Sequence, residues 1–300
     1  MAPISDNMRG AALMTGAMVT FTINDSFTKS LGDVLPLWQL LFLRGIGVTL
    51  CLVVMARATG QLRFDLARRD WGIMWLRALG EIGGAYFFIT ALFHMPIANV
   101  SAIMQVLPLS VSLAGALFMS EALGWRRLVA ILIGFGGVML IVRPGGADFN
   151  LFSLYALGAV ACVTLRDLIV RKLSRSVPSL MVSLVAAAGI MVFAGVASLT
   201  EDWQPMTPIE ALHLGGATIF VIFGYIFSVA AMRVGEIGFV APFRYTSLLT
   251  AILLGMLVFG EFPSALTLTG AGIVVATGIF TLLRERRLRL RRPVVPDRIR

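Results

Sequence analysis

Ten apolar segments follow one another along the chain, separated only by short polar breaks. Each is about 20 residues long, and a helix of that length, rising 1.5 Å per residue, crosses the ~30 Å hydrocarbon core of a bilayer. Hydrophobic residues make up 58% of the chain and charged residues 14%, against roughly 45–50% and about 25% in soluble domains. No water-soluble fold of 300 residues buries that much apolar surface. The sequence therefore predicts an all-α membrane protein.

The apolar segments set the expected helix boundaries. We expect transmembrane helices at residues 10–30, 36–56, 71–93, 97–119, 126–143, 151–171, 178–199, 211–232, 237–259 and 264–283. The breaks between them are too short to hold an extra-membrane domain. The first segment has no small-residue cleavage site, so we expect it to be a retained helix rather than a removed signal peptide.

The basic residues are distributed unevenly between the two predicted sides of the membrane. With ten spans, 19 of the 25 lysines and arginines fall on the side of the N-terminus, and four more arginines lie within helices. The opposite side receives only Lys29 and Arg143. Because basic loops stay in the cytoplasm, both termini are predicted to be cytoplasmic, in a multi-pass protein of a bacterial-type inner membrane. The net charge of +9 then needs no nucleic-acid partner, which would require a basic face on a soluble domain.

Short motifs recur in the same order in the two halves of the chain. The matching segments are 24–32 and 166–174, 118–121 and 258–261, and 134–136 and 270–272, at offsets of 136 to 142 residues. Each half has five helices, an odd number, so the second half enters the membrane from the opposite side. Such inverted repeats are typical of carriers that alternate access to a central site. They divide the chain into repeats at 9–143 and 151–283 and a basic cytoplasmic tail at 284–300.

More local motifs accompany this pattern: Asn24-Asp25-x-x-x-Lys29, Arg44, Trp125-Arg126-Arg127, Ala241-Pro242-Phe243-Arg244-Tyr245 and Gly260-Glu261-Phe262-Pro263. With ten spans, two halves, and Glu121 and Glu261 after the fourth and ninth helices, the chain resembles the drug/metabolite transporter superfamily, specifically its EamA-type members. The resemblance covers residues 9–283 and extends to two bacterial uptake branches, for riboflavin and for S-adenosylmethionine. It implies a proton-independent or weakly coupled carrier, or an exchanger, with its pocket between the halves. Riboflavin uptake is the first expectation; the alternatives are S-adenosylmethionine, an amino acid or another metabolite, in either direction.

Charged residues within the predicted helices are the candidate substrate-binding residues, because a charge at the bilayer centre costs about 2.5–3.5 kcal/mol unless it faces a cavity or a partner. Arg77 and Glu81 lie four residues apart on one helix face, a spacing that favours an ion pair. They either neutralise each other or line the pocket. Asp25 and Arg44 are expected to meet across the first helix hairpin, as a structural pair or as substrate-binding or gating residues. Asp25 is also the first candidate for proton coupling.

The ninth predicted helix carries Arg244 beside Tyr245, and its repeat position in the fourth helix holds the neutral Gln105. A guanidinium next to an aromatic ring is suited to a carboxylate, a phosphate or a flat ring. We therefore include all three residues in the predicted substrate site. Arg166 and Asp167, near the end of the sixth helix, are interpreted more simply as side chains that snorkel to the interface.

The sequence lacks the motifs that are typical of enzymes, ATPases and metal-binding proteins. The chain has no H-E-x-x-H or G-x-S-x-G sequence and no G-x-x-x-x-G-K-[ST] loop, so we predict no catalytic residues, no enzyme activity and no ATPase of its own. Cys51, Cys162, His94 and His213 form no ligand cluster in the sequence, so no metal site or cofactor is expected. The expected partners are a small-molecule substrate and the lipid bilayer, with the chain a monomer or homodimer. The alternative to a carrier is a membrane receptor or assembly factor.

Overall fold

The computed structural model describes residues 6–120, 124–145, 149–174 and 176–290, and these ranges contain helices and no strands. The first half consists of α1 (Asp6–Lys29), α2 (Leu37–Ala58), α3 (Arg68–His94), α4 (Ile97–Met104), α5 (Leu107–Met119) and α6 (Trp125–Val142). The second half consists of α7 (Phe152–Val170), α8 (Ser179–Ala197), η1 (Ser198–Thr200), α9 (Pro208–Val234), α10 (Ile237–Val240), η2 (Ala241–Tyr245), α11 (Thr246–Phe259) and α12 (Ala265–Leu290). The all-α prediction is confirmed.

These elements group into ten membrane-crossing units, because α4 continues into α5, and α10 and η2 continue into α11. Among the described residues, nine stretches are long and apolar enough to cross a membrane. The tenth is α1, whose 24 residues include Asp6, Arg9, Asp25 and Lys29. The observed helix ends agree with the predicted ones to within about one turn, except that α12 continues to Leu290.

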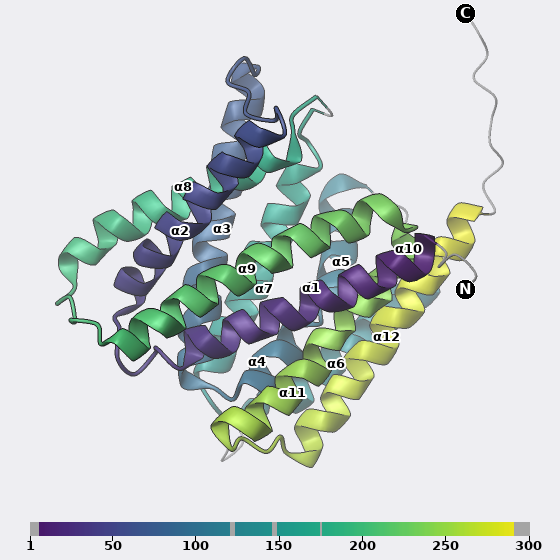
Figure 1. Ribbon diagram of the computed structural model, residues 1–300. Helices are drawn as coiled ribbons and strands as arrows, with labels where there is room; N and C mark the ends of the chain where they lie inside the picture. The colour runs from purple at the N-terminus through teal and green to yellow at the C-terminus, as the bar shows by residue number, and fades with distance from the viewer. Residues whose placement is uncertain (1–5, 121–123, 146–148, 175, 291–300) are drawn as a thin grey trace, which may run out of the picture.

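The two halves interleave in a way that follows the repeat. α1 packs along α9 and α3 packs along α7, and exchanging the halves converts the first contact into the second. The other two extensive contacts, α2 with α8 and α6 with α12, pair each helix with its own repeat partner. Figure 1 shows α1 and α9 side by side across the front of the molecule. The inverted five-helix repeat predicted from the sequence is confirmed.

Two of the ten units are broken in the middle, where continuous helices were predicted. α4 ends at Met104, and Pro108 lies at the start of α5. In the other half, Pro242 lies within the 3₁₀ segment η2 that leads into α11. Proline has no N–H for the helix and its ring clashes with the carbonyl four residues earlier, so each break lies at its proline. Gln105 and the segment containing Arg244 thus lie at the equivalent breaks of the two halves.

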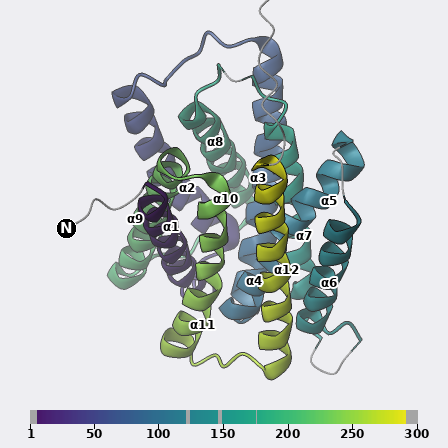
Figure 2. The same ribbon diagram turned by 90° about the vertical axis from the view of Figure 1, so that its right-hand side faces the viewer.

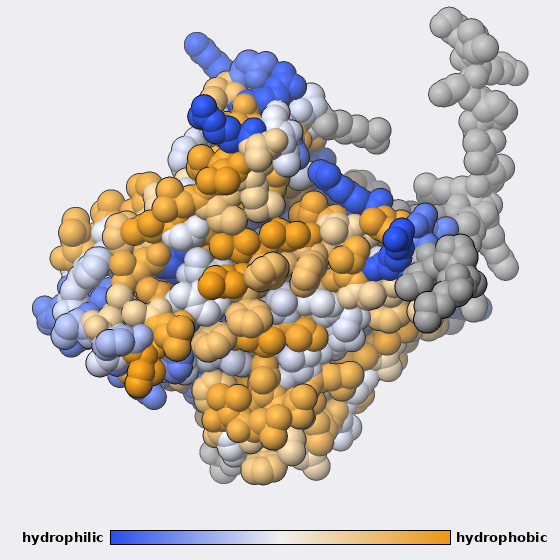
Figure 3. All heavy atoms as spheres, in the orientation of Figure 1, coloured by the Kyte–Doolittle hydropathy of each residue, from blue (hydrophilic) through white to orange (hydrophobic). Residues whose placement is uncertain are grey.

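The outer surface of the helices is apolar. Large side chains such as Leu50, Leu132 and Leu257 are more than half exposed, and Figure 3 shows apolar residues over most of the visible face, with hydrophilic ones gathered at the ends of the helices. Exposed aliphatic side chains over such an area are suited to lipid acyl chains rather than water.

Glycines allow the two halves to approach closely where α6 meets α12. A Cβ added at Gly270 would overlap the backbone oxygen of Gly137, and one added at Gly137 would lie 2.8 Å from the oxygen of Gly270. A larger residue at either position requires the helices to separate. Small residues at such contacts are typical of helix pairs in lipid, which associate through close packing.

Candidate functional site

A cavity of about 190 Å³ lies between the two halves. It is lined by α2 and α3 of the first half and by α7, α8 and α9 of the second. The lining residues are Leu41, Arg44, Gly45, Val48, Leu52, Arg77, Glu81, Arg166, Ser183, Ala186, Ala187, Ile190, Val221 and Tyr225. Most of these side chains are apolar, and the charged ones are three arginines and one glutamate. The described lining therefore carries an excess of positive charge.

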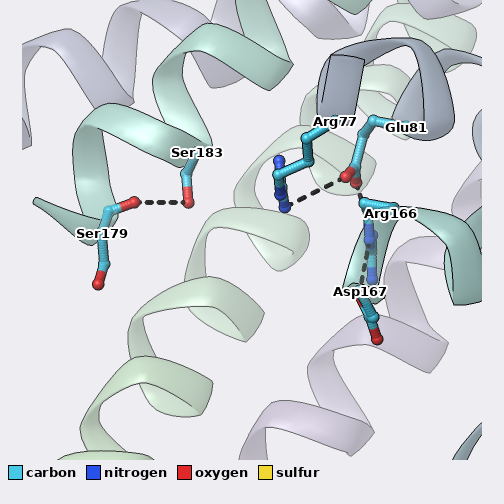
Figure 4. Close-up of polar contacts among 6 residues, drawn as sticks. All are labelled: Arg77, Glu81, Arg166, Asp167, Ser179 and Ser183. Carbon is cyan, nitrogen blue, oxygen red and sulfur yellow. Dashed lines mark hydrogen bonds and ion pairs between the residues drawn. The ribbon is translucent and has the colours of Figure 1, made fainter. Parts of the chain in front are cut away.

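Glu81 joins the two neighbouring arginines of this lining. Its Oε1 lies 2.9 Å from Nη1 of Arg166 on α7, and its Oε2 lies 3.3 Å from Nη2 of Arg77, one turn earlier on α3. Arg166 also pairs through Nε with Oδ1 of Asp167, at 3.0 Å. Figure 4 shows the Arg77 and Arg166 side chains converging on the Glu81 carboxylate, with Asp167 beside Arg166. The Nη1 atom of Arg77 is buried without a hydrogen-bond partner, so it is available to a ligand.

Asp25 and Arg44 approach each other as predicted, but through a third residue. Arg44 Nη1 donates to Oδ1 of Asn24 and to Oγ1 of Thr28, each at 3.3 Å. The Asn24 amide in turn donates to Oδ1 of Asp25 at 2.9 Å, and the Asp25 carboxylate attracts the Arg44 guanidinium electrostatically. α1 thus fixes the Arg44 head group at the cavity wall, with a carboxylate behind it.

The prediction that Arg166 snorkels to the interface is wrong. Arg166 lines the cavity and pairs with Glu81 of the other half. The cause is the close approach of α3 and α7: a Cβ added at Gly80 would lie 3.1 Å from Cβ of Arg166. Gly80, Gly83 and Gly84 next to Glu81 were the sequence signal for this approach.

The remaining predicted residues lie outside the lining of this cavity. Gln105 is buried at the break between α4 and α5 and donates from Nε2 to Oγ of Ser247, at 2.6 Å. Arg244 lies in η2 among protein atoms but keeps an accessible side chain, and Asp167 attracts it electrostatically. Tyr245 is buried against α12, where its hydroxyl group would overlap a Cβ at Gly278. Substrate contacts of these three residues stay predictions.

Sequence reasoning missed two polar residues of the cavity. Tyr225 of α9 and Ser183 of α8 line it, although neither stands in a recognisable motif. Aromatic residues of α2 and α3 that lie outside this lining contact one another. Trp38 stacks on Tyr86 with ring centroids 5.5 Å apart, and Tyr86 meets Phe87 edge to face at 5.2 Å.

A second polar cluster joins the two halves near the end of α1. Lys29 pairs with Oε1 of Glu261 at 3.0 Å and donates to the backbone oxygen of Leu92 at 3.1 Å. The other carboxylate oxygen of Glu261 accepts from the backbone N–H of Ile97, in the first turn of α4, at 2.9 Å. Glu261 therefore holds the ends of α1 and α4 together, whereas Glu121, at the equivalent position of the first half, lies outside the described residues.

This architecture matches a known family. The profile of the EamA-like transporter family matches residues 8–143 and again residues 151–283. The chain belongs to this family. A solved crystal structure also has the fold of this EamA-like protein, with a TM-score of 0.63 at 20% identity over 93% of this chain and 98% of the other.

Curated relatives of this EamA-like chain are transporters with different named substrates. The chain is similar to a riboflavin transporter of Vibrio cholerae, at 30% identity over 91% of this chain and 92% of the relative. It is similar to an S-adenosylmethionine uptake transporter of Rickettsia prowazekii at 24% identity, over 90% and 91% of the two chains. A pseudopaline exporter of Pseudomonas aeruginosa is 26% identical over 93% and 97%. The EamA-like protein is thus a multi-pass membrane transporter.

Proposed function

We propose that this protein is an inner-membrane secondary carrier that works by alternating access. It takes up a small organic metabolite rich in hydrogen-bond acceptors, with riboflavin as the first candidate. Both termini lie in the cytoplasm in this proposal, because the basic loops are on their side of the membrane. The similarity to the Vibrio cholerae riboflavin transporter supports the substrate.

The observation that carries the proposal is the excess of guanidinium donors in a cavity that is otherwise mostly apolar. The described lining residues include three arginines, Arg44, Arg77 and Arg166, and a single carboxylate, Glu81. Riboflavin offers several carbonyl and hydroxyl oxygens that accept hydrogen bonds, together with a flat ring that suits the apolar wall. S-adenosylmethionine carries a sulfonium cation, and the single carboxylate of the described lining, Glu81, is already paired with Arg77 and Arg166. The charge of the cavity therefore favours riboflavin.

The cavity must widen to receive the whole substrate. Its volume of about 190 Å³ is below the ~300–1,000 Å³ of pockets that enclose drug-sized ligands. Since the cavity lies between the halves, separation of α2 and α3 from α8 and α9 enlarges it. Alternating access supplies such a movement, because one repeat rocks against the other around the site.

S-adenosylmethionine is the second candidate, favoured by its named carriers among the relatives and by two carboxylates near the arginines. Glu81 lines the cavity and Asp25 lies behind Arg44, and either carboxylate suits an ammonium group. Competition between the two solutes for one carrier distinguishes the candidates.

The test is uptake of labelled riboflavin into bacteria that cannot synthesise it, comparing the intact protein with R44A and R244A at matched membrane expression. We expect the intact protein to take up labelled riboflavin and unlabelled riboflavin to inhibit this uptake by competition. In R44A the uptake rate should fall about tenfold or more, because a hydrogen bond to a charged group contributes about 1.5–3 kcal/mol. R57A is the matched control, since Arg57 is an exposed arginine at the end of α2, away from the cavity. Well-expressed protein without riboflavin flux would exclude riboflavin, and labelled S-adenosylmethionine is then tested. Flux of neither solute in proteoliposomes would exclude both candidates and leave another metabolite, or a receptor or assembly factor, as the alternatives.

A further inference from the structure

A second concave site lies on the outer surface, between α6 and α12, and is separate from the charged cavity. This outer groove has a volume of about 380 Å³ and is lined by Trp125, Arg126, Val129, Ala130, Ile133, Ala276, Thr277 and Phe280. Figure 2 shows α6 and α12 running side by side. The groove occupies the end of the helix pair at which α6 begins, because Gly137 and Gly270 bring the helices into contact farther along. It shares no lining residue with the candidate substrate cavity.

The walls of the outer groove are suited to a hydrocarbon chain. Val129, Ile133 and Phe280 form raised sides that are 44%, 52% and 47% exposed, whereas Ala130 on the floor is buried. From Trp125 to Ile133, helix α6 rises about 12 Å at 1.5 Å per residue. This length covers most of the ~15 Å depth of one leaflet of the hydrocarbon core. An acyl chain that enters from the nearby membrane surface therefore fits along the groove.

Two arginines flank the end of the groove that lies nearest the membrane surface. The Arg126 guanidinium carbon lies 5.2 Å from the centroid of the Trp125 ring, and this indole is 70% exposed. On α12, Arg284 follows Phe280 by four residues, so it lies on the same helix face one turn beyond the groove. A tryptophan with neighbouring basic residues is typical of the interfacial region, where lipid phosphates lie.

We propose that the outer groove binds an anionic phospholipid, with an acyl chain along α6 and α12 and the phosphate between Arg126 and Arg284. Basic pockets between transmembrane helices bind anionic head groups in this way. The charged end selects the head group, and the apolar walls hold the chain. The site is independent of which solute the carrier moves.

A second copy of the chain is a poorer occupant of this groove. Two copies that share one orientation in the membrane pair about an axis along the membrane normal, so the same patch meets itself. Arg126 and Arg284 of both copies would then lie at one depth, and four guanidinium groups in a medium of low dielectric constant repel one another. An anionic lipid neutralises the same two arginines instead.

Trp125 allows the site to be observed directly. The full-length protein is reconstituted into phosphatidylcholine vesicles that contain increasing fractions of phosphatidylglycerol with brominated acyl chains, which quench nearby tryptophan fluorescence. The difference in fluorescence between the intact protein and W125F isolates the signal of Trp125 from the other four tryptophans. We expect half-quenching at a roughly thirtyfold lower fraction of brominated phosphatidylglycerol than of brominated phosphatidylcholine, since each of the two arginines near an anionic surface contributes about 1 kcal/mol.

Three variants separate the possible outcomes. R126Q/R284Q should lose the preference for phosphatidylglycerol, whereas R57Q/R233Q, which removes two exposed arginines outside the groove, should keep it. A276F fills the groove without changing charge and should also lose the preference. The proposal is overturned if R126Q/R284Q retains the preference, or if A276F retains it, which would indicate surface attraction alone. Equally weak quenching of Trp125 by both brominated lipids would also overturn it and indicate a groove covered by a second copy.

Discussion

The two halves contribute side chains to the cavity from equivalent positions, but with different chemistry. α2 and α8 line it with pairs separated by 142 residues: Leu41 and Ser183, Arg44 and Ala186, Gly45 and Ala187, and Val48 and Ile190. α3 and α9 do the same at a separation of 144 residues, with Arg77 and Val221, and Glu81 and Tyr225. Where the first half has a charge, the second half has an aliphatic or aromatic side chain at each of these three positions.

The backbone enclosure of the cavity is therefore shared by both halves, whereas most of the charged side chains that could recognise a substrate belong to the first half. The repeat provides a symmetric enclosure, which allows two equivalent rocking movements about one site. The charges of α2 and α3, joined by Arg166 of α7, provide recognition on one side, and α9 and most of α8 provide an apolar wall. A ligand held in such a cavity has its polar edge toward the first half. Substitutions that exchange the chemistry of equivalent positions test this interpretation.

The largest effect is expected from E81Q, which removes the carboxylate shared by Arg77 and Arg166. Removing one partner of a buried ion pair leaves an uncompensated charge, at a cost of about 3–5 kcal/mol. We therefore expect a clear fall in the unfolding temperature of the purified protein and loss of uptake. D202N is the control, because it removes a carboxylate from an exposed loop. If E81Q were as stable as the intact protein, the two guanidinium groups would not depend on Glu81.

An intermediate effect is expected from R77V, which copies the aliphatic side chain of the equivalent Val221. Glu81 keeps its shorter contact with Arg166, so folding should be affected less than in E81Q. The unpaired Nη1 donor is lost, and we expect kcat/KM for uptake to fall about tenfold, the equivalent of 1.4 kcal/mol. V221A is the matched control and should stay within about twofold, because it removes only apolar contact area. Equal losses in R77V and V221A would contradict the division between a polar and an apolar half.

The smallest effect is expected from Y225F, which removes a single hydroxyl group from the apolar side of the cavity. The ring stays in place and keeps its edge-to-face contact with Phe21. One neutral hydrogen bond to the substrate contributes about 0.5–1.5 kcal/mol, so KM should rise a few fold while kcat and the unfolding temperature stay unchanged. A loss as large as that of R77V would place a principal polar contact in the second half.

The sequence predicted most of the fold because a membrane imposes simple rules on it. Helix length, loop charge and the internal repeat led to ten helices in two inverted halves, and the observed helices agree. It could not predict the broken units, because an apolar segment that contains Pro108 or Pro242 is compatible with a kinked helix as well as an interrupted one. The breaks depend on the packing around each proline.

The candidate site was predicted in part. Arg44, Arg77 and Glu81 line one cavity, since charges within apolar helices have few other places to lie. The position of Arg166 was predicted wrongly, because it depends on how closely α3 and α7 pack. The sequence periodicity of one helix does not indicate its distance from another helix. Tyr225 and Ser183 are ordinary residues of apolar helices, and only the three-dimensional structure identifies them as part of the lining.

The contact at Lys29 has a consequence for the speed of the transport cycle proposed above. One carboxylate, Glu261, holds the end of α1 with one oxygen and the first turn of α4 with the other. The same carboxylate thus ties the end of α1 to the first turn of α4, so a movement of Glu261 changes both contacts together. The lifetime of the closed state then depends on residues that lie outside the lining of the substrate cavity. Substitutions at position 29 can thus change the turnover number while the selectivity of the carrier stays the same.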